Sequence, residues 1–524
     1  KTVDFTAPDQ DKLIIYELLV RDFIAAHDWK TLTDTLDYFS NLGINAIELM
    51  PVNEFEGNES WGYNPSFYFA ADKYYGPADD LKAFVDSCHG RGIAVIIDMV
   101  LNHSYGQSPL VQLYFENGKV SSENPWYNVD SPNQAYYWGY DFDHESPATR
   151  DFVDRVNAYW LDTFRVDGFR FDLASALARG EDGEPLRDAP VLWGIELSDQ
   201  LSRTRLIAEA WDAAGLYQVG SFPGYRWAEW NGRYRDIIRR FVRGDKGLVS
   251  ELATRMCGSS DFYKPQHRLP INSINFITCH DGFTLCDLFS YNEKHNEANG
   301  EGNRDGHNDN LSFNHGVEGE TDDPGILAQR SRQAKNTIAI LLLSQGVPML
   351  LAGDEVLNTQ NGNNNGYCQN NELTWFDWRL LQTNADMLRF VRHMIALRKR
   401  HPCLMRRRFL NGSAVTGRDI PDVSWHGIDI DAPLWNDPDA QVLAFTLAAV
   451  ADGEADMHVM LNLSDSGIDM EVPAIDGREL RLALDTGLMA PDDIVSPEQQ
   501  TSFSEKRYPV AAQTVVVFEA VAVF

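Results

Sequence analysis

The feature that most constrains the fold of this chain is an alternation of strand-like and helix-like segments over about its first 400 residues. Strands that alternate with helices form parallel sheets, because each helical connection crosses back over the sheet. Eight such units predict an α/β fold, a (β/α)8 TIM barrel with insertions. The expected strands are Leu13–Tyr16, Ala46–Met50, Ala94–Leu101, Val166–Phe171, Leu206–Ala208, Trp227–Trp230, Ile274–Thr278 and Pro348–Leu351. The clearest expected helices are Trp29–Leu42, Asp80–His89 and Pro147–Phe164.

Two insertions and a C-terminal region complete the predicted organisation. His103–Ser146 follows the third strand, and Gly282–Gly325 follows the seventh. Loops of this length are usually functional, and both follow the carboxyl ends of strands, so we expect them above the barrel mouth. From about Met405 on, short alternating runs predict a small antiparallel β domain. The predicted domains are a barrel over 1–102 and 147–404, an inserted loop domain over 103–146 and a C-terminal domain over 405–524.

The charge of the chain limits its partners. The formal net charge is −32, which disfavours nucleic acid and anionic membranes and suits an uncharged substrate. No apolar run approaches the ~18–20 residues of a membrane helix. We therefore expect no nucleic acid or membrane partner, and the sequence does not set the oligomeric state.

The six cysteines are scattered, and none forms a CxxC pair or a zinc pattern. This usage favours a reducing, cytoplasmic setting over secretion. The chain begins with Lys1 rather than Met, so we expect a trimmed N-terminus.

Three acidic residues end three predicted strands, each inside a distinctive string. They are Asp172 in VDGFRFDLAS, Glu209 in RLIAEAWD and Asp281 in NFITCHDGF. In a barrel of this type, the carboxyl ends of the strands meet at one active-site mouth. Two carboxyl groups ~5–5.5 Å apart cleave glycosidic bonds with retention of configuration. The alternative is three unrelated helix N-caps, which the ordered recurrence disfavours.

The residues around the first two carboxylates suggest how each is tuned. Arg170 lies two residues before Asp172, on the same side of a strand, where it would keep Asp172 ionised. The alternative for Arg170 is an ion pair with no reactive neighbour. Apolar residues and Trp211 flank Glu209, and desolvation there would raise its pKa, as a general acid requires.

Three further polar residues occur in the string IIDMVLNHS. Asp98 and Asn102 share one face of a strand, and Asp98 is placed to pair with Arg170. His103 is a candidate donor to a sugar hydroxyl. Asn102 is a candidate calcium ligand or a loop clamp, although a calcium site needs more oxygens than the sequence provides. We expect no required cofactor, with calcium as a possible one.

Aromatic side chains are the other requirement of a sugar site, because pyranose rings stack on them. Trp61 and Tyr63, in SWGYNPSFYFA after the second strand, are the candidates, with Trp375 and Trp378 as weaker ones. The alternative is that these rings belong to the core. His280 precedes Asp281, and Asp281 could hold sugar hydroxyls or stabilise oxocarbenium charge.

The strings DMVLNH, GFRFD, AEAW and CHD together resemble the four ordered signatures of the α-amylase superfamily, glycoside hydrolase family thirteen. The resemblance implies that Asp172 is the nucleophile, Glu209 the acid/base and Asp281 the stabiliser of the transition state. It also implies a loop domain after strand three and a C-terminal antiparallel β-sandwich. The contacts it implies around the cleaved sugar are Arg170, His103, His280 and Tyr63.

Within this superfamily the chain changes character near Val166–Asp172. The first third, including YELLVRDF and DMVLNHSYGQSPLVQLYF, looks like bacterial α-amylases. The remainder, including GFRFDLASAL and NTQNGNNNGYCQNNELTWFDW, looks like isoamylase and the bacterial glycogen debranching enzymes. The expected function is therefore a retaining α-glucan hydrolase that debranches α-1,6 bonds of glycogen or amylopectin. The alternatives are an endo α-1,4-amylase, a dual α-1,4/α-1,6 activity, and a non-catalytic α-glucan-binding subunit.

Overall fold

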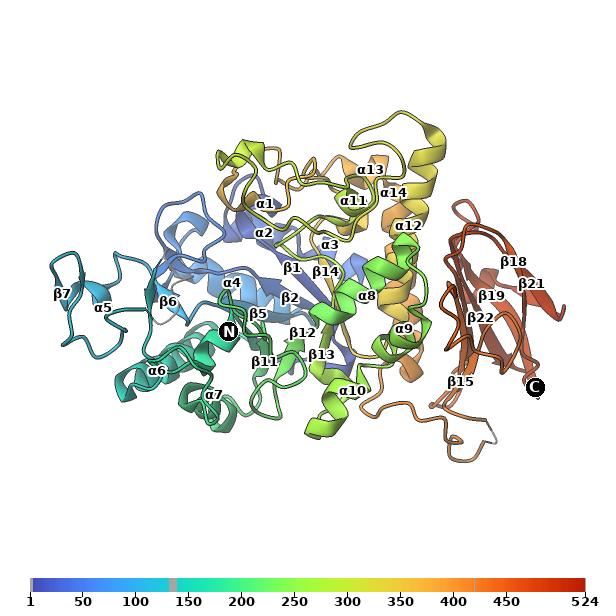
Figure 1. Ribbon diagram of the computed structural model, residues 1–524, viewed down its shortest axis with the longest axis horizontal. Helices are drawn as coiled ribbons and strands as arrows, with labels where there is room; N and C mark the ends of the chain where they lie inside the picture. Colours follow the sequence, from blue (N-terminus) through green and yellow to red (C-terminus); the bar gives the residue numbers. More distant parts are fainter. Residues whose placement is uncertain (1–2, 132–138, 419, 524) are drawn as a thin grey trace. The chain divides into compact units, whose positions relative to one another are not determined.

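Eight strands form a closed barrel (Figure 1), in the order β1-β14-β13-β12-β11-β10-β5-β2. The computed structural model describes residues 3–131, 139–418 and 420–523. The barrel strands are β1 Ile15–Leu18, β2 Ala46–Leu49, β5 Ala94–Met99, β10 Gly168–Phe171, β11 Arg205–Ala208, β12 Ala228–Trp230, β13 Ser273–Asn275 and β14 Val347–Leu351. The predicted (β/α)8 barrel is confirmed, and each strand overlaps the segment that the sequence predicts.

The chain divides into two compact units. The first unit comprises Lys1–Asn231, Phe262–Arg268 and Gly366–Phe376. The second comprises Gly232–Asp261, Leu269–Asn365 and Asp377–Phe524. The barrel strands up to β12 belong to the first unit, and β13, β14 and the C-terminal strands belong to the second.

The first unit contains several helices, and capping explains the bounds of α6 (Pro147–Phe164). The helices are α1 Val20–Phe23, α2 Trp29–Asp34, α3 Leu36–Leu42, α4 Ala78–His89, α5 Pro109–Gln112, α6 Pro147–Phe164 and α7 Pro190–Leu197. Helix α6 has the bounds that the sequence predicts. The side chain of Ser146 accepts the N–H of Ala148, Pro147 occupies the first turn, and Arg165 ends the helix in the left-handed region.

One predicted helix is two helices in the structure. The sequence predicts a single helix over Trp29–Leu42, but α2 ends at Asp34 and α3 begins at Leu36. Thr35, between them, has φ −93° and ψ 0°, and its hydroxyl donates to the carbonyl of Leu32 at 2.7 Å. A side chain that bonds to the backbone in this way competes with the helical ladder. Apolar periodicity does not report such a break.

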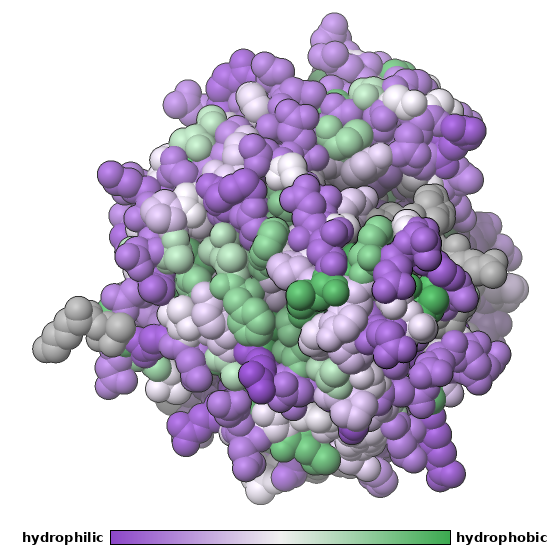
Figure 2. All heavy atoms as spheres, turned by 90° about the vertical axis from the view of Figure 1, so that its left-hand side faces the viewer, coloured by the Kyte–Doolittle hydropathy of each residue, from purple (hydrophilic) through white to green (hydrophobic). Residues whose placement is uncertain are grey.

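Short antiparallel pairs extend the first unit beyond the barrel. They are β3 Asn53–Phe55 with β4 Pro65–Ala71, β6 His103–Ser104 with β9 Tyr140–Asp141, and β7 Phe115–Glu116 with β8 Lys119–Val120. The last two pairs, with α5, form the insertion after β5, of which 132–138 lies outside the described residues. Phe67 and Phe69 of β4 and Leu113 after α5 are 40%, 44% and 66% exposed. Figure 2, which views the molecule from the side of β7 and α5, shows apolar atoms gathered in the middle of this face.

The remaining helices are α8 Gly232–Arg243, α9 Val249–Met256, α10 Ser260–Tyr263, α11 Leu285–Leu288, α12 Pro324–Leu343, α13 Leu380–Thr383 and α14 Ala385–Arg400. Asp323 caps α12, because its carboxylate accepts the N–H groups of Gly325 and Ile326. Within the described ranges, no helix has both the length and the apolar character needed to cross a membrane.

The C-terminal region is antiparallel, as predicted. Six strands form one sheet in the order β15-β16-β17-β22-β19-β20, and β18 pairs with β21 in a second. Their bounds are β15 Val423–His426, β16 Val442–Leu447, β17 Asp456–Asn462, β18 Ile468–Glu471, β19 Arg478–Asp485, β20 Thr501–Phe503, β21 Arg507–Val510 and β22 Thr514–Ala522. Buried side chains of both sheets share one core, which includes Val442, Met460, Met470, Val510 and Phe518.

The C-terminal sheets are joined to α12 by buried polar contacts within the second unit. Asn336 donates to the carbonyl of Gln513 at 2.8 Å and accepts from the hydroxyl of Thr486 at 2.5 Å. Lys335 pairs with the buried carboxylate of Asp493 at 2.7 Å. These contacts satisfy polar groups that burial would otherwise leave unpaired.

Candidate active site

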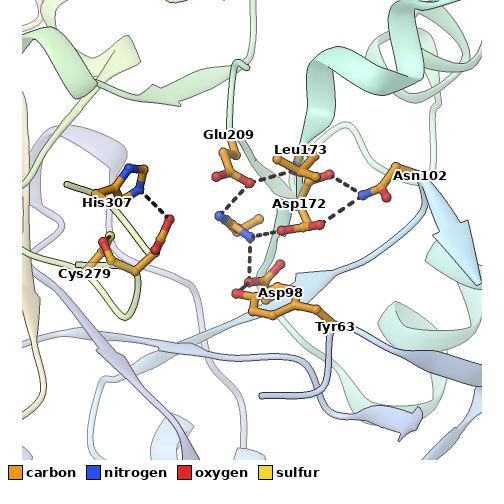
Figure 3. Close-up of polar contacts among 10 residues, drawn as sticks. Tyr63, Asp98, Asn102, Asp172, Leu173, Glu209, Cys279 and His307 are labelled. Carbon is orange, nitrogen blue, oxygen red and sulfur yellow. Dashed lines mark hydrogen bonds and ion pairs between the residues drawn. The ribbon is translucent and has the colours of Figure 1, made fainter. Parts of the chain in front are cut away.

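One buried guanidinium, that of Arg170, contacts three carboxylates of the first unit (Figure 3). Arg170 lies in β10 with no exposed surface. Its Nη1 donates to Oδ2 of Asp98 at 2.8 Å and to Oδ1 of Asp172 at 3.1 Å. Its Nη2 lies 3.0 Å from Oε2 of Glu209. Because a guanidinium offers five donors in a fixed plane, one side chain holds three carboxylates from three neighbouring segments.

The parallel register of the strands brings these carboxylates together. Phe171 at the end of β10 pairs with Ala208 at the end of β11, so the residues that follow, Asp172 and Glu209, leave the barrel at the same level. Arg170 pairs in register with Asp98 of β5. The three predicted residues Asp98, Asp172 and Glu209 therefore meet around Arg170, as a barrel mouth built from strand ends requires.

The guanidinium is further enclosed by aromatic rings. Its Cζ lies 4.2 Å from the ring centroid of Trp230 in β12 and 6.0 Å from that of Tyr63. The hydroxyl of Tyr63 donates to Oδ2 of Asp98 at 2.6 Å. Burial opposes the charge of Arg170, but the carboxylates of Asp98 and Glu209 outweigh it and raise the Arg170 pKa well above its usual value. Burial raises the pKa of Asp98 to about 6, although Arg170 counteracts it.

Asn102 and His103 support Asp172 from the side. Nδ2 of Asn102 donates to both the carbonyl and Oδ2 of Asp172, each at 3.0 Å. Nδ1 of His103 lies against Oδ1 of Asn102, and its Nε2 lies 2.9 Å from the carbonyl of Tyr63. His103 is 1% exposed, and burial lowers its pKa. Both ring nitrogens face protein oxygens, so a contact from His103 to a sugar stays a prediction.

The structure gives Asn102 the role of a clamp on Asp172. The alternative role that the sequence suggests, a calcium ligand, would require the side-chain oxygen of Asn102, which lies against His103. Within 3–131, 139–418 and 420–523, no group of three or more His, Cys, Asp or Glu is arranged to hold a metal ion. The calcium role of Asn102 stays a prediction.

Glu209 makes polar contacts that the sequence does not predict. Oε2 of Glu209 accepts the backbone N–H of Leu173 at 2.7 Å and pairs with Arg170. The apolar, aromatic surroundings that the sequence indicates for Glu209 stay a prediction. Trp211 stacks on Tyr217, with ring centroids 5.8 Å apart, and the Arg170 side chain that pairs with Glu209 comes from β10.

The other predicted aromatic contacts fall into two groups. Trp61 packs edge-on against Tyr63, with centroids 6.5 Å apart, and against Tyr367 at 6.3 Å. Trp61 is therefore adjacent to Tyr63, which contacts Asp98 and Arg170. Trp375 donates from Nε1 to the side-chain oxygen of Asn370 at 3.0 Å, and its ring packs against His27.

The third predicted carboxylate, Asp281, lies in the second unit together with His280. Its Oδ2 is 3.3 Å from Nε2 of His307, and the two side chains are 45% and 61% exposed. Partial burial would raise the pKa of Asp281, but His307 and His280 outweigh it and lower that pKa. Sequence reasoning missed His307, although it lies in the Asn- and Gly-rich loop that the sequence marks as functional.

Two family models match parts of the chain. Residues 5–139 match the model described as alpha amylase, catalytic domain, and residues 424–522 match isoamylase 1-3, C-terminal. Isoamylase 3, chloroplastic, of Oryza sativa subsp. japonica is 38% identical over 552 residues, which cover 98% of this chain and 68% of the rice protein. This chain belongs to the α-amylase superfamily, in its isoamylase type.

Further similarities agree with membership of the α-amylase superfamily. The protein named glycogen debranching enzyme from Enterobacter sp. (strain 638) is 41% identical over 395 residues, covering 70% of this chain and 58% of that protein. Pullulanase type I from Bacillus subtilis str. 168, whose structure is complexed with maltose, has a TM-score of 0.75 at 22% identity. The match covers 100% of this chain and 72% of the pullulanase chain, and shows that the two share a fold. The chain thus spans between 58% and 68% of the length of these two curated relatives.

Proposed function

We propose that this chain hydrolyses α-1,6 branch points of glycogen or amylopectin with retention of anomeric configuration. The observation that carries the proposal is that Asp172 and Glu209 bind the two terminal nitrogens of one guanidinium. This arrangement suits the carboxyl separation of about 5–5.5 Å that retaining glycosidases use. The relatives named isoamylase and glycogen debranching enzyme support the choice of a branched α-glucan as substrate.

In the first step of the proposed reaction, Oδ1 or Oδ2 of Asp172 attacks the anomeric carbon and forms a glycosyl ester. Glu209 gives its proton to the glycosidic oxygen as the C1–O bond breaks, and the chain that carried the branch leaves. Arg170 and Asn102 hold the Asp172 carboxyl group fixed in orientation for this attack. Glu209 must carry a proton at this point, so substrate must weaken its contact with Arg170.

In the second step, Glu209 is a carboxylate and takes a proton from water. The hydroxide equivalent attacks the anomeric carbon from the opposite face to Asp172, and the ester bond breaks. The contacts of Glu209 with Leu173 N–H and Arg170 Nη2 favour the carboxylate form that this step needs. Two inversions at one carbon give net retention.

The other predicted residues have binding roles in the proposal. Asp281 binds hydroxyls of the cleaved sugar and stabilises its positive charge in the transition state. Tyr63 holds Asp98 through its hydroxyl and offers its ring as a sugar platform. The further proposed sugar contacts are Trp61, His103, Trp211 and His280. The free thiols of all six cysteines support a reducing compartment.

A second candidate, cleavage of α-1,4 bonds, is favoured by the alpha amylase model that matches residues 5–139. Chain-length analysis of products from amylopectin and linear amylose separates the two. The proposal expects linear chains from amylopectin and intact amylose. Rapid shortening of amylose would assign the second candidate instead. Activity that Asp172→Asn leaves unchanged would contradict both, and no activity on any α-glucan would favour a binding subunit.

A further inference from the structure

His307 contacts Asp281, which lies 26 residues earlier in the sequence. We propose that His307 is a positioning residue that holds the Asp281 side chain in the orientation needed for the reaction. The inference rests on the proposed function, since the orientation of Asp281 matters only if the chain cleaves a glycosidic bond. It concerns a residue beyond the carboxylates and sugar contacts described above.

The contact leaves Asp281 accessible to a ligand. Nε2 of His307 lies 3.3 Å from Oδ2 of Asp281, and 45% of the Asp281 side chain is exposed. A partner on one carboxylate oxygen restricts rotation of the group and leaves the second oxygen available for a sugar hydroxyl. Preorganised groups of this kind need no reordering when charge develops in the transition state.

A buried asparagine holds both partners in place. The carbonyl of Asn364 accepts the N–H of Gly282, the residue after Asp281, at 3.1 Å. Its side-chain Nδ2 donates to the carbonyl of His307 at 2.8 Å. Asn364 has no exposed surface, and its own backbone N–H donates to Oδ1 of Asn296 at 2.9 Å. One residue thus fixes the spacing between the two chain segments that carry the pair.

A second bridge connects the same two segments. Arg239 of α8 donates from Nε and Nη2 to the carbonyl of Ile277, four residues before Asp281, at 2.9 and 2.6 Å. Its Nη1 donates to the carbonyl of Asn310, three residues after His307, at 3.0 Å. Two buried residues, Asn364 and Arg239, therefore tie the His307 loop to the Asp281 segment and hold His307 beside Asp281.

The charges around the pair determine how it responds to pH. Asp281 raises the pKa of His307, mainly through their hydrogen bond, while Arg235 and Arg239 oppose this effect. Asp281 also faces His280 and Arg235. The imidazolium persists to a higher pH than in a free histidine, and the charged contact weakens as pH rises through that raised pKa.

Four proteins test the inference: wild type, H307A, H307Q and H295Q as a matched control. His295 lies in the same loop and pairs with Glu318 at 3.1 Å, in a contact of the same type that does not touch Asp281. Each is assayed for kcat and KM on a branched maltooligosaccharide across pH, with melting temperature as a measure of folding. The imidazole NMR titration of His307 in wild type and D281N gives a readout that needs no activity.

We expect H307A to lower kcat by about three- to tenfold, with a smaller change in KM, because the contact is partly exposed to solvent. H307Q retains a hydrogen-bond donor, so its kcat should lie between those of H307A and wild type. The fall in kcat at alkaline pH that deprotonation of His307 causes should be absent in H307Q. H295Q should match wild type. In the titration, the pKa of His307 should fall in D281N.

Two results would overturn the inference. One is a His307 titration that D281N leaves unchanged. The other is a pH profile and kcat that H307A and H307Q share with wild type. If wild type shortens amylose and leaves branch points intact, the proposed bond specificity fails, whereas the NMR titration and the same variants assayed on amylose still decide the role of His307.

Discussion

The backbone N–H of Leu173 donates to Oε2 of Glu209 at 2.7 Å, so the residue after Asp172 contacts the second carboxylate directly. Leu173 has φ 39°, in the left-handed region that a leucine occupies at a cost of roughly 1–2 kcal/mol. An unfavourable backbone conformation at such a place is typical of functional sites. The turn after Asp172 therefore links the two carboxylates through the chain itself.

Glu209→Gln separates the chemistry from this structural contact. The amide oxygen of Gln still accepts the Leu173 N–H, but the side chain no longer transfers a proton. We expect kcat to fall by about 10²–10⁴-fold with a small change in melting temperature. Glu196→Gln is the matched control, since Glu196 is 6% exposed and accepts the N–H groups of Tyr225 and Arg226 in the same unit. Equal loss of activity in both variants would contradict the assignment.

Arg170→Lys tests whether the fork of the guanidinium matters beyond its charge. A lysine ammonium cannot hold three carboxylates in the present geometry, and it lacks the planar group that lies over the Trp230 ring. We expect kcat to fall by about 100-fold, because the carboxylates shift from their positions. Steady-state kinetics measures this effect.

Stability must be separated from activity in that experiment. Arg268→Lys alters another buried pair of the first unit, Arg268 with Glu229. It should lower the melting temperature as Arg170→Lys does, with a much smaller loss of kcat. An R170K enzyme within a few-fold of wild type would show that charge alone suffices.

The sequence predicts the barrel and the acidic cluster well because both follow from short-range patterns. Strand ends and the period of two along β10 place Arg170 beside Asp172, and parallel register brings Glu209 to the same level. By contrast, the polar surroundings of Glu209 depend on the backbone turn at Leu173, which no pattern reports. His307 is 26 residues from Asp281 in sequence, and their contact depends on a buried asparagine 57 residues further on.

Acid should destabilise the C-terminal region through two buried histidines. Nε2 of His426 lies 3.0 Å from the hydroxyl of Thr446, which lies 3.0 Å from Nδ1 of His458. Burial lowers the pKa of His426, and it lowers the pKa of His458 to about 3. The unfolded chain, with a histidine pKa of about 6.5, binds protons that the folded chain does not. The contribution of these two histidines to the free energy of unfolding is therefore fully present above about pH 6.5 and is lost as the pH drops toward 3.

Between about pH 3 and pH 6.5, His458 should add up to about 1.4 kcal/mol per pH unit to the slope of the free energy of unfolding against pH. Calorimetric melting at several pH values measures it. Replacing His458 with Gln should remove the contribution of one proton to the slope of the free energy of unfolding against pH. A slope that H458Q does not alter would show that His458 titrates alike in both states.

Chelation tests the alternative role of Asn102. Its amide clamps Asp172 and its oxygen lies against His103, so the active site should work without a divalent cation. We expect kcat to stay within about twofold after dialysis against a chelator, since the clamp is a protein contact. A large loss that calcium restores would assign a metal site that the account does not include.

Proton NMR of the anomeric signals of amylopectin during the first minutes of hydrolysis tests both the bond that is cleaved and the retention of configuration. Cleavage of α-1,6 bonds through an Asp172 ester predicts that the α-1,6 signal falls, the α-1,4 signal stays constant, and new reducing ends appear first as the α-anomer. Reducing ends that appear first as the β-anomer would contradict the two-step mechanism. Early loss of the α-1,4 signal would contradict the proposed bond specificity.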